Sequence, residues 1–304
     1  MNKALIIGAA GFIGHNLAKR LKSEGWWVGG VDLKYPVYEE TPCDEFLIAD
    51  ASMETFIHEK FDRIYQLAAD MGGAGFVFTG ENDADIMRNS SLINLNVLRQ
   101  VAWTGVGTIF YSSSACVYPD GVEGKEENAY PADPVSNYGW EKLFSERLYQ
   151  AYAKNKGVNV RIARFHNTFG PYGTYEGGRE KAPAAICRKV LQATDSIEIW
   201  GDGNQLRPFI YIEDLLDGIE ALMKSDFNEP VNLGPDGGIT INELVDMVST
   251  FDEKNLKKIH IDGPTGEQKR NVNTDLALNK IGWHSQDRFV EGMKTTYEWI
   301  KTQL

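Results

Sequence analysis

The sequence predicts an α/β fold in which a doubly wound parallel sheet fills the first half of the chain and a smaller lobe follows at the C-terminal end. Three observations support this prediction. Short apolar runs alternate with helical patterns up to about residue 165, glycine and proline become frequent after that point, and no internal repeat or long linker interrupts the chain. Strands that alternate with helices form parallel sheets with helices on both faces.

The predicted elements follow one another in a regular order. The first strand covers residues 4–7, and in the helix expected over 12–24 the residues Ile13, Leu17 and Leu21 form one apolar stripe. Further strands are expected at 27–31, 46–48, 63–67, 108–112, 160–164 and 197–200, and further helices at 83–103, 137–155, 184–192 and 213–223. We therefore assign residues 1–165 to the sheet domain, expect a segment of about 208–225 to return to it, and assign residues 166–304 mainly to a substrate-binding lobe.

Composition and charge exclude several classes of function. The 304 residues carry 31 lysine and arginine against 43 aspartate and glutamate side chains, and the net charge of −12 argues against a broad nucleic-acid-binding surface. The three cysteines are too scattered for a disulfide framework or a zinc site, and no two of the five histidines have metal-ligand spacing. No apolar run approaches the roughly 20 residues of a membrane span. The sequence thus predicts a cytoplasmic protein without a metal, and without a nucleic acid or a membrane as partner.

A glycine-rich turn lies between the first strand and the first helix. Its glycines and the helical residues beside them are Gly8, Gly11, Phe12, Ile13 and Gly14. Glycine permits the tight turn and lets backbone amides approach a pyrophosphate at the positive end of a helix. Asp32 ends the next strand about 20 residues further on, where a carboxylate accepts the ribose hydroxyls of NAD and repels the extra phosphate of NADP. These features predict a Rossmann domain that binds NAD, with Asp50 as a further candidate contact, to the adenine.

A tyrosine and a lysine four residues apart form a second candidate site. Tyr138 and Lys142 lie on one face of the helix expected at 137–155. A nearby ammonium favours the phenolate and so draws the pKa of a tyrosine below its ordinary value of about 10. Ser114 follows the strand expected at 108–112 and is able to hydrogen-bond the same substrate oxygen. Such a pair is common on protein surfaces, so the glycine-rich turn and the serine carry much of this interpretation.

These motifs together span the first half of the chain and resemble the extended short-chain dehydrogenase/reductase family. The resemblance implies that Tyr138 is the acid or base for a sugar hydroxyl, that Lys142 tunes it and that Ser114 orients it. Hydride would then pass between the sugar carbon and the nicotinamide. The resemblance also implies a homodimer that pairs the helices expected at 83–103 and 137–155 across a two-fold axis.

Two motifs in the second half resemble the substrate lobe of the same family, whose substrates are nucleotide-diphosphate sugars. Residues 164–171 match its Arg-x-x-Asn-x-x-Gly-Pro element, which implies that Asn167 contacts the diphosphate or the sugar. Residues 200–207 match a glycine-rich turn whose arginine, here Arg207, holds the nucleotide phosphates with its planar fork. Arg270 is a second candidate for that task, although an isolated arginine more often forms a surface salt bridge.

Enzymes with this scaffold catalyse three reactions, namely 4-epimerisation, 4,6-dehydration and 3,5-epimerisation. Each reaction begins with oxidation of C4 of the sugar to a ketone. A dehydratase of the family has an Asp-Glu pair just after the active-site serine, where this chain has Ala115 and Cys116. A thiol has an ordinary pKa of about 8.5, which positive charge lowers, and it is able to remove a proton made acidic by the adjacent ketone. Inversion by proton transfer also needs a donor on the opposite face, and Lys181 is the candidate.

Residues 68–73, 112–119 and 177–185 resemble the GDP-mannose 3,5-epimerase family in particular. By that resemblance Cys116 and Lys181 are the acid/base pair that exchanges protons at C5 and C3. Residues 68–73 would contribute Ala68 and Ala69 to the cofactor site and Met71, Gly72 and Gly73 to the substrate site. Ser90 and Gln268 depart from the family pattern, which commonly has asparagine and arginine at these positions.

Rival interpretations stay open at this stage. GDP-4-keto-6-deoxymannose epimerase-reductase (GDP-fucose synthase) also has a cysteine in this motif, but Asp32 disfavours NADPH and Lys181 replaces that family's histidine. A plain nucleotide-sugar 4-epimerase comes next. From another class, a non-catalytic NAD-sensing interaction protein would use the same scaffold, although Tyr138 and Lys142 are both present. A buried structural cysteine and a solvated loop lysine are the alternatives for Cys116 and Lys181.

Overall fold

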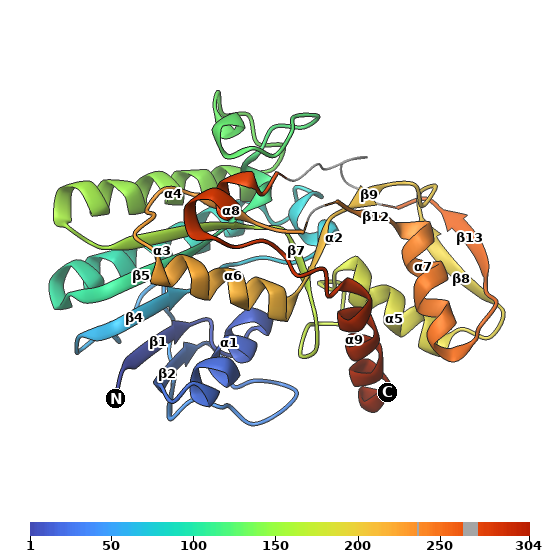
Figure 1. The fold of residues 1–304 in the computed structure, drawn as a ribbon, viewed down its shortest axis with the longest axis horizontal. Helices are drawn as coiled ribbons and strands as arrows, with labels where there is room; N and C mark the ends of the chain where they lie inside the picture. Colours follow the sequence, from blue (N-terminus) through green and yellow to red (C-terminus); the bar gives the residue numbers. More distant parts are fainter. Residues whose placement is uncertain (236, 264–272) are drawn as a thin grey trace.

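The computed structural model describes residues 1–235, 237–263 and 273–304. Within these residues seven strands form one sheet in the order β11-β6-β5-β4-β1-β2-β3 (Figure 1). The strands are β1 (Lys3–Ile7), β2 (Trp27–Asp32), β3 (Glu45–Ile48), β4 (Phe61–Gln66), β5 (Val106–Ser114), β6 (Val160–Phe165) and β11 (Val231–Leu233). All neighbouring pairs run parallel, which confirms the doubly wound parallel sheet that the sequence predicts.

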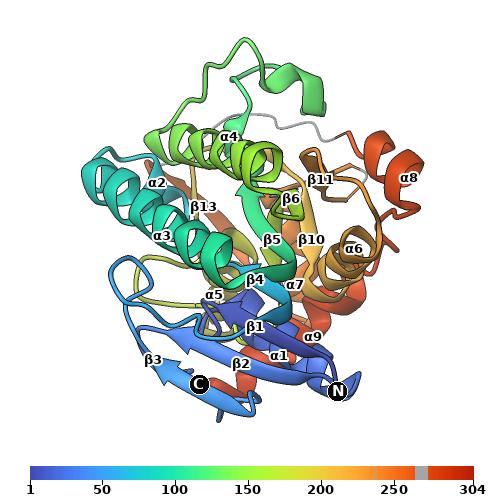
Figure 2. The same cartoon turned by 90° about the vertical axis from the view of Figure 1, so that its left-hand side faces the viewer.

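Helices cover both faces of this sheet (Figure 2). The helices α1 (Phe12–Ser23) and α6 (Ile212–Lys224) lie on one face, and α3 (Asp83–Thr104) and α4 (Asn137–Lys156) lie on the other. Side chains of a strand alternate between the two faces. Ile6 of β1 therefore packs in one core with Leu17 of α1, whereas its neighbour Ile7 packs in the other core. The strand order reverses between β1 and β4, and folds of this type bind ligands at the carboxyl edge beside such a reversal.

The start and the end of α4 are set by residues suited to those positions. The Ser136 hydroxyl caps the helix by accepting a hydrogen bond from the Gly139 backbone N–H at 3.2 Å. Gly157 ends the helix in the left-handed conformation that glycine adopts without strain. The cap places Tyr138 and Lys142 in the first two turns of α4, next to the carboxyl end of β5.

The C-terminal lobe packs helices on small sheets and lies to the right of the main sheet in Figure 1. Its helices are α5 (Ala182–Gln192), α7 (Ile241–Ser249) and α9 (Phe289–Gln303). Its paired strands are β8 (Ser196–Trp200) with β13 (Lys257–Ile261), β9 (Leu206–Arg207) with β12 (Ile239–Thr240), and β7 (Asn167–Phe169) with β10 (Phe209–Tyr211). Shorter elements are α2 (Ala74–Val77), α8 (Asp275–Ile281) and the 3-10 turns η1 (Ala115–Val117), η2 (Glu126–Ala129) and η3 (Thr250–Asp252).

The chain crosses back to the main sheet after its first visit to the lobe. The helix α6 contacts α1, and β11 pairs with β6. The expected returning segment, at about 208–225, contains α6, but the sequence analysis did not predict β11. A three-residue strand is too short to show a periodic pattern, which explains the omission.

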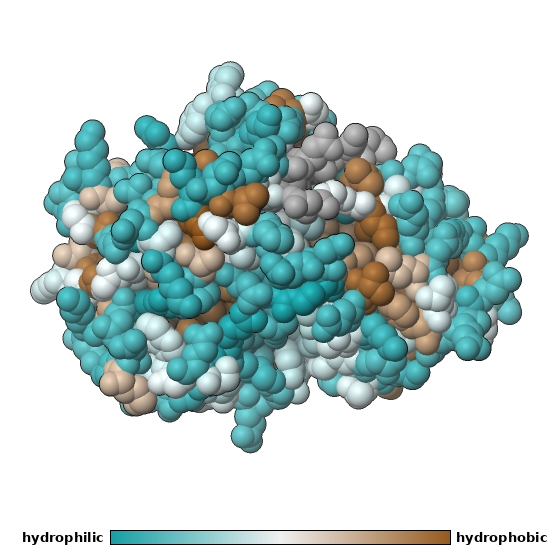
Figure 3. Space-filling model, viewed as in Figure 1, coloured by the Kyte–Doolittle hydropathy of each residue, from teal (hydrophilic) through white to brown (hydrophobic). Residues whose placement is uncertain are grey.

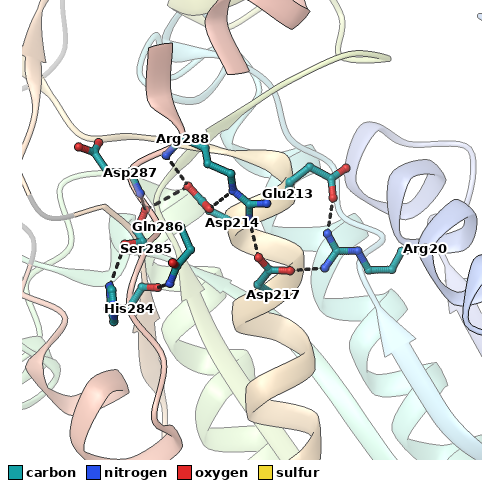
Figure 4. Close-up of polar contacts among 9 residues, drawn as sticks. All are labelled: Arg20, Glu213, Asp214, Asp217, His284, Ser285, Gln286, Asp287 and Arg288. Atoms are coloured by element: carbon teal, nitrogen blue, oxygen red, sulfur yellow. Dashed lines mark hydrogen bonds and ion pairs between the residues drawn. The ribbon is translucent and has the colours of Figure 1, made fainter. Parts of the chain in front are cut away.

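A network of ion pairs joins α1, α6 and the segment before α9 (Figure 4). Arg20 of α1 pairs with both Glu213 and Asp217 of α6. Arg288, just before α9, pairs with Asp217 and donates from Nε to the Asp214 carboxylate at 2.6 Å. The Asp214 side chain is only 2% exposed, so its charge depends on Arg288 for compensation. The network therefore fixes the C-terminal helix to the first helix of the sheet domain.

The surface is mostly polar. The face drawn in Figure 3 is mainly hydrophilic, and apolar residues are seen on it both where α8 lies and where β9 and β12 lie in Figure 1. In the part of the chain that the structure describes, none of the helices has the length and apolar character needed to cross a bilayer.

Candidate active site

The glycine-rich turn connects β1 to α1 and packs against the segment that follows β4. The contacts are so close that a side chain would not fit at Gly8 or at Gly14. Gly8 has φ = +89°, and a Cβ atom there would lie 2.8 Å from the Ala68 backbone nitrogen. A Cβ atom on Gly14 would lie 2.1 Å from the Gly8 carbonyl oxygen. The helix α1 begins at Phe12 and no side chain caps it, so its first N–H groups face the turn without a side-chain acceptor. This cradle fits the pyrophosphate of a dinucleotide.

Asp32 is held at the edge of this turn. Its carboxylate accepts hydrogen bonds from the backbone N–H groups of Ala10 at 2.9 Å and Leu33 at 2.7 Å, which fix it at the carboxyl end of β2, where a ribose would lie. Asp50 uses its carboxylate within a local turn instead, accepting from Ser52. Two of the residues expected to contact the cofactor, Tyr138 and Lys142, lie on α4. The others lie at or next to the carboxyl ends of β1 to β4: Gly8, Gly11, Phe12, Ile13, Gly14, Asp32, Asp50, Ala68 and Ala69.

The tyrosine and the lysine of α4 are both buried beside the end of β5. Lys142 donates from Nζ to the Ser112 carbonyl oxygen at 2.9 Å, and Nζ lies 5.6 Å from the centre of the Tyr138 ring. Burial raises the pKa of Tyr138 well above its ordinary value, the Cys116 charge raises it further, and the Ser114 hydroxyl lowers it in part. Burial also lowers the pKa of Lys142.

These directions correct one expectation from the sequence, that the Lys142 ammonium would draw the pKa of Tyr138 down. Both groups lie in the low-dielectric interior, where desolvation penalises the charged form of each and is the largest cause of both pKa shifts. Burial therefore sets the direction of the Tyr138 pKa shift in this structure.

Cys116 lies in η1, directly after β5. Its backbone N–H donates to the Ser114 hydroxyl oxygen at 3.2 Å, and its side chain packs in one cluster with Tyr138 and Met71. The first turn of α4 lies directly against this segment, because a Cβ atom on Gly139 would be only 2.1 Å from the Cys116 carbonyl oxygen. Glycine at this position therefore lets the helix that carries the tyrosine pack onto the backbone that carries the thiol.

Lys181 reaches the same region from the other lobe. It is the N-cap residue of α5, and its side chain lines a cavity of about 260 Å³ between the two lobes. Burial lowers the pKa of its ammonium, while the Cys116 charge acts in the opposite direction. The thiol and the amine are therefore close enough to interact electrostatically, and the neutral amine is more populated than in an exposed lysine.

A buried ion pair supports the strand end that carries Ser114 and Cys116. Arg164 of β6 binds Glu146 of α4 through two hydrogen bonds, of 2.9 Å from Nε and 2.7 Å from Nη2, and both side chains are 2% exposed. The Ser113 hydroxyl donates to the same carboxylate, and Arg164 donates to the Tyr118 hydroxyl oxygen. The pair thus fixes residues on both sides of the thiol.

The cavity beside Lys181 contains other residues expected to contact substrate. Gly73, Asn167 and Arg207 line it, whereas Met71 packs against the tyrosine and Gly72 lies on Phe76. The sequence analysis missed further polar groups in the lining, namely Lys189, Glu198 and Gln205. An alternating pattern marks Glu198 only as an outward residue of β8, so no sequence signal pointed to it. Arg270 and Gln268 lie outside the described residues.

Comparisons with known proteins agree with this geometry. A family model described as "NAD dependent epimerase/dehydratase family" matches residues 4–234. A GDP-mannose 3,5-epimerase of Arabidopsis thaliana is 45% identical, over 99% of this chain and 83% of the relative. GDP-mannose 3,5-epimerase 1 of Oryza sativa subsp. indica is 42% identical, over 98% of this chain and 82% of the relative.

Among solved structures, a UDP-glucose 4-epimerase of Thermotoga maritima has the same fold, with a TM-score of 0.88 at 22% identity over 99% of both chains. The cradle at the glycine-rich turn fits the cofactor that the family description names. The chain therefore belongs to the NAD-dependent epimerase/dehydratase family.

Proposed function

We propose that the protein is an NAD-dependent nucleotide-sugar epimerase of the GDP-mannose 3,5-epimerase type. The observation that carries this proposal is the presence of Cys116 and Lys181, which come from different lobes, beside a buried tyrosine. The identity of 45% with a GDP-mannose 3,5-epimerase over nearly the whole chain supports the same substrate. In this proposal residues 1–165, with about 208–225, bind the cofactor, and residues 166–304 mainly bind the nucleotide sugar.

The first step takes place at C4 of the sugar. Bound NAD supplies reversible oxidation at this carbon and a positive charge that favours the tyrosinate. Tyr138 removes the proton of the C4 hydroxyl, and the Ser114 hydroxyl, which acts on the same tyrosine, orients that oxygen. Lys142 holds its place through the Ser112 carbonyl and adds positive charge near the tyrosine when protonated.

The next step is proton exchange at the carbons next to the ketone. Cys116 and Lys181 take and return protons on opposite faces of the ring, at C5 and at C3. The lowered pKa of Lys181 keeps part of its population neutral, so the amine is able to accept a proton as well as donate one. Bound NAD would take up the C4 hydride in the first step and give it back in the last, so no external reductant would be consumed.

Exchange with heavy water tests this function directly. The purified protein is incubated with GDP-mannose in D₂O, and NMR reads deuterium at each ring carbon. We expect deuterium at C5, at C3 or at both. A 4-epimerase would change the configuration at C4 without deuterium at C3 or C5, and a non-catalytic NAD-binding protein would change nothing. Either result contradicts the proposal.

Replacement of Lys181 by alanine should separate the two steps. We expect the Lys181→Ala variant to lose about 10²-fold or more of its epimerisation rate, because a positioned acid or base contributes at least that factor. Oxidation at C4 should continue, so the near-ultraviolet absorbance of the reduced nicotinamide should still develop on addition of substrate. The control is Lys60→Ala, which removes an exposed lysine far from the cavity. An unchanged product ratio in Lys181→Ala would show that Lys181 has no part in the proton exchange.

We also propose a homodimer that pairs α3 and α4 with their copies. These helices lie side by side on one face of the sheet (Figure 2). They expose large apolar side chains, with exposed fractions of 41% for Leu95, 41% for Trp140 and 48% for Phe144. Sedimentation should give twice the chain mass for the natural protein and the monomer mass for a Trp140→Glu/Phe144→Glu double variant. The cytoplasmic location stays a prediction.

A further inference from the structure

Two loops from different lobes meet at the edge of the cavity beside Lys181. The first, residues 70–78, is here termed the sugar loop, and the second, residues 178–181, the lysine loop. The Gly73 backbone N–H of the sugar loop donates to the Arg179 carbonyl oxygen of the lysine loop at 3.1 Å. A Cβ atom on Gly73 would lie 2.5 Å from the Glu180 carbonyl oxygen, so the two backbones touch without an intervening side chain.

The side chain of Arg179 makes three further contacts across this junction. Its Nη1 lies 3.6 Å from Oδ1 of Asp70 and 3.5 Å from the Met71 carbonyl oxygen. Its guanidinium carbon lies 4.0 Å from the centre of the Phe76 ring, within the range of a cation–π interaction. One arginine of the lysine loop therefore contacts three separate residues of the sugar loop.

Each loop is in turn attached to a helix. In the sugar loop, the Asp70 carboxylate accepts from the Asn89 side chain at 3.0 Å, and the Asp70 N–H donates to the Ser90 hydroxyl at 3.1 Å, which fixes this loop on α3. In the lysine loop, Glu180 accepts from the Gly178 N–H at 2.6 Å and pairs with Arg188 of α5 at 3.6 Å. Lys181 follows directly after these contacts.

We propose that Arg179 is a positioning residue that holds the lysine loop against the sugar loop and so sets where the Lys181 amine meets the sugar. The proposal rests on the proposed function. The Arg179 side chain is 55% exposed, and ion pairs at such positions are weak. The contact is therefore weak enough to be broken and remade, and its role lies in position and not in the stability of the fold.

The variant Arg179→Met tests this role, because it keeps an apolar side chain over Phe76 and removes the ion pair and the hydrogen bond. We expect kcat to fall by about tenfold or more, since small displacements of a catalytic group have large effects on rate. The KM for GDP-mannose should change by less, because Arg179 itself does not line the cavity and the lining residues Asn167 and Arg207 lie outside both loops. The near-ultraviolet absorbance of the reduced nicotinamide should rise in the steady state, because C4 oxidation proceeds while proton exchange is slowed.

Three further variants keep the test decisive. Arg179→Lys retains the charge and should recover part of the kcat that Arg179→Met loses. Asp70→Asn weakens the same ion pair from the sugar loop, so it should show a smaller rise in the absorbance of the reduced nicotinamide. This second variant tests the proposal even if Arg179→Met folds poorly. Lys294→Met removes one exposed positive charge from α9 and should match the natural protein. Wild-type kcat and absorbance in both Arg179→Met and Asp70→Asn overturn the positioning role. Absence of deuterium exchange by the natural protein itself would instead overturn the proposed function.

Discussion

Replacing Cys116 by serine should lower the rate of proton exchange at C5 and C3 by about 10²-fold or more, within the range that general acid–base groups contribute. A hydroxyl is a much weaker acid than a thiol, so at neutral pH it does not supply the anion that removes a carbon-bound proton. Serine is close in size to cysteine, and Cys116 has only a small side chain in the cluster with Tyr138 and Met71, so the fold should persist. Deuterium uptake in D₂O, followed by NMR, measures the effect.

A second cysteine provides the matched control for this variant. Cys43 lies in the loop between β2 and β3, beside Gly30 and Phe46, and outside the cavity. We expect Cys43→Ser to retain most of the exchange rate. Retention of NAD by both variants, measured from the absorbance of the purified protein, would show that only the proton transfer is affected. Undiminished exchange in Cys116→Ser would remove the thiol from the mechanism.

The largest expected effect on stability comes from the ion pair between Arg164 and Glu146. We expect Arg164→Met to lower the free energy of unfolding by about 3–5 kcal/mol, because the Glu146 carboxylate would remain buried without its countercharge. Denaturation by urea, followed by circular dichroism, measures the change. The same variant should also lower turnover of the remaining folded protein, because Arg164 contacts Tyr118, two residues after the thiol.

Two comparison variants define the cause of that loss. Lys280→Met, on the exposed surface of α8, should change the free energy of unfolding by no more than about 0.5 kcal/mol. The double variant Arg164→Met/Glu146→Leu removes both charges and should recover part of the loss, since a buried ion pair is often replaceable by apolar side chains. Equal stability of Arg164→Met and the natural protein would contradict the assigned role of the pair.

The sequence predicted the main sheet well because its strands and helices are long enough to show a period. The strand expected at 4–7 is β1 (Lys3–Ile7), and the helix expected at 137–155 is α4 (Asn137–Lys156). The strand pairs of the C-terminal lobe were largely missed, because β9 and β12 have two residues each and β7 has three. Such short strands form only because the tertiary structure brings them together.

The residues of the candidate site were likewise predicted only in part. Cys116 and Lys181 could be proposed from the sequence because each lies in a distinctive local motif, although whether they meet is decided by the packing of two lobes. Lys189, Glu198 and the contacts of Arg179 were not found, because they become neighbours of the cavity only when residues more than 100 positions apart are folded together. The pKa of Tyr138 was expected in the wrong direction, because a sequence does not report how deeply a phenol is buried.

The absence of space between Gly139 and the Cys116 carbonyl has a consequence for how such enzymes diversify. In the proposed function, the groups that act on the C4 hydroxyl and the thiol that acts on the ring lie in closely packed segments, whereas the amine lies on a separately anchored loop. Under the proposed function, one half of the proton-exchange pair is thus fixed to the groups that oxidise the sugar, and only the other half is encoded in a separate part of the chain. Selection is able to remodel the lysine loop, and with it which ring carbons invert, while the machinery for oxidising the sugar stays intact.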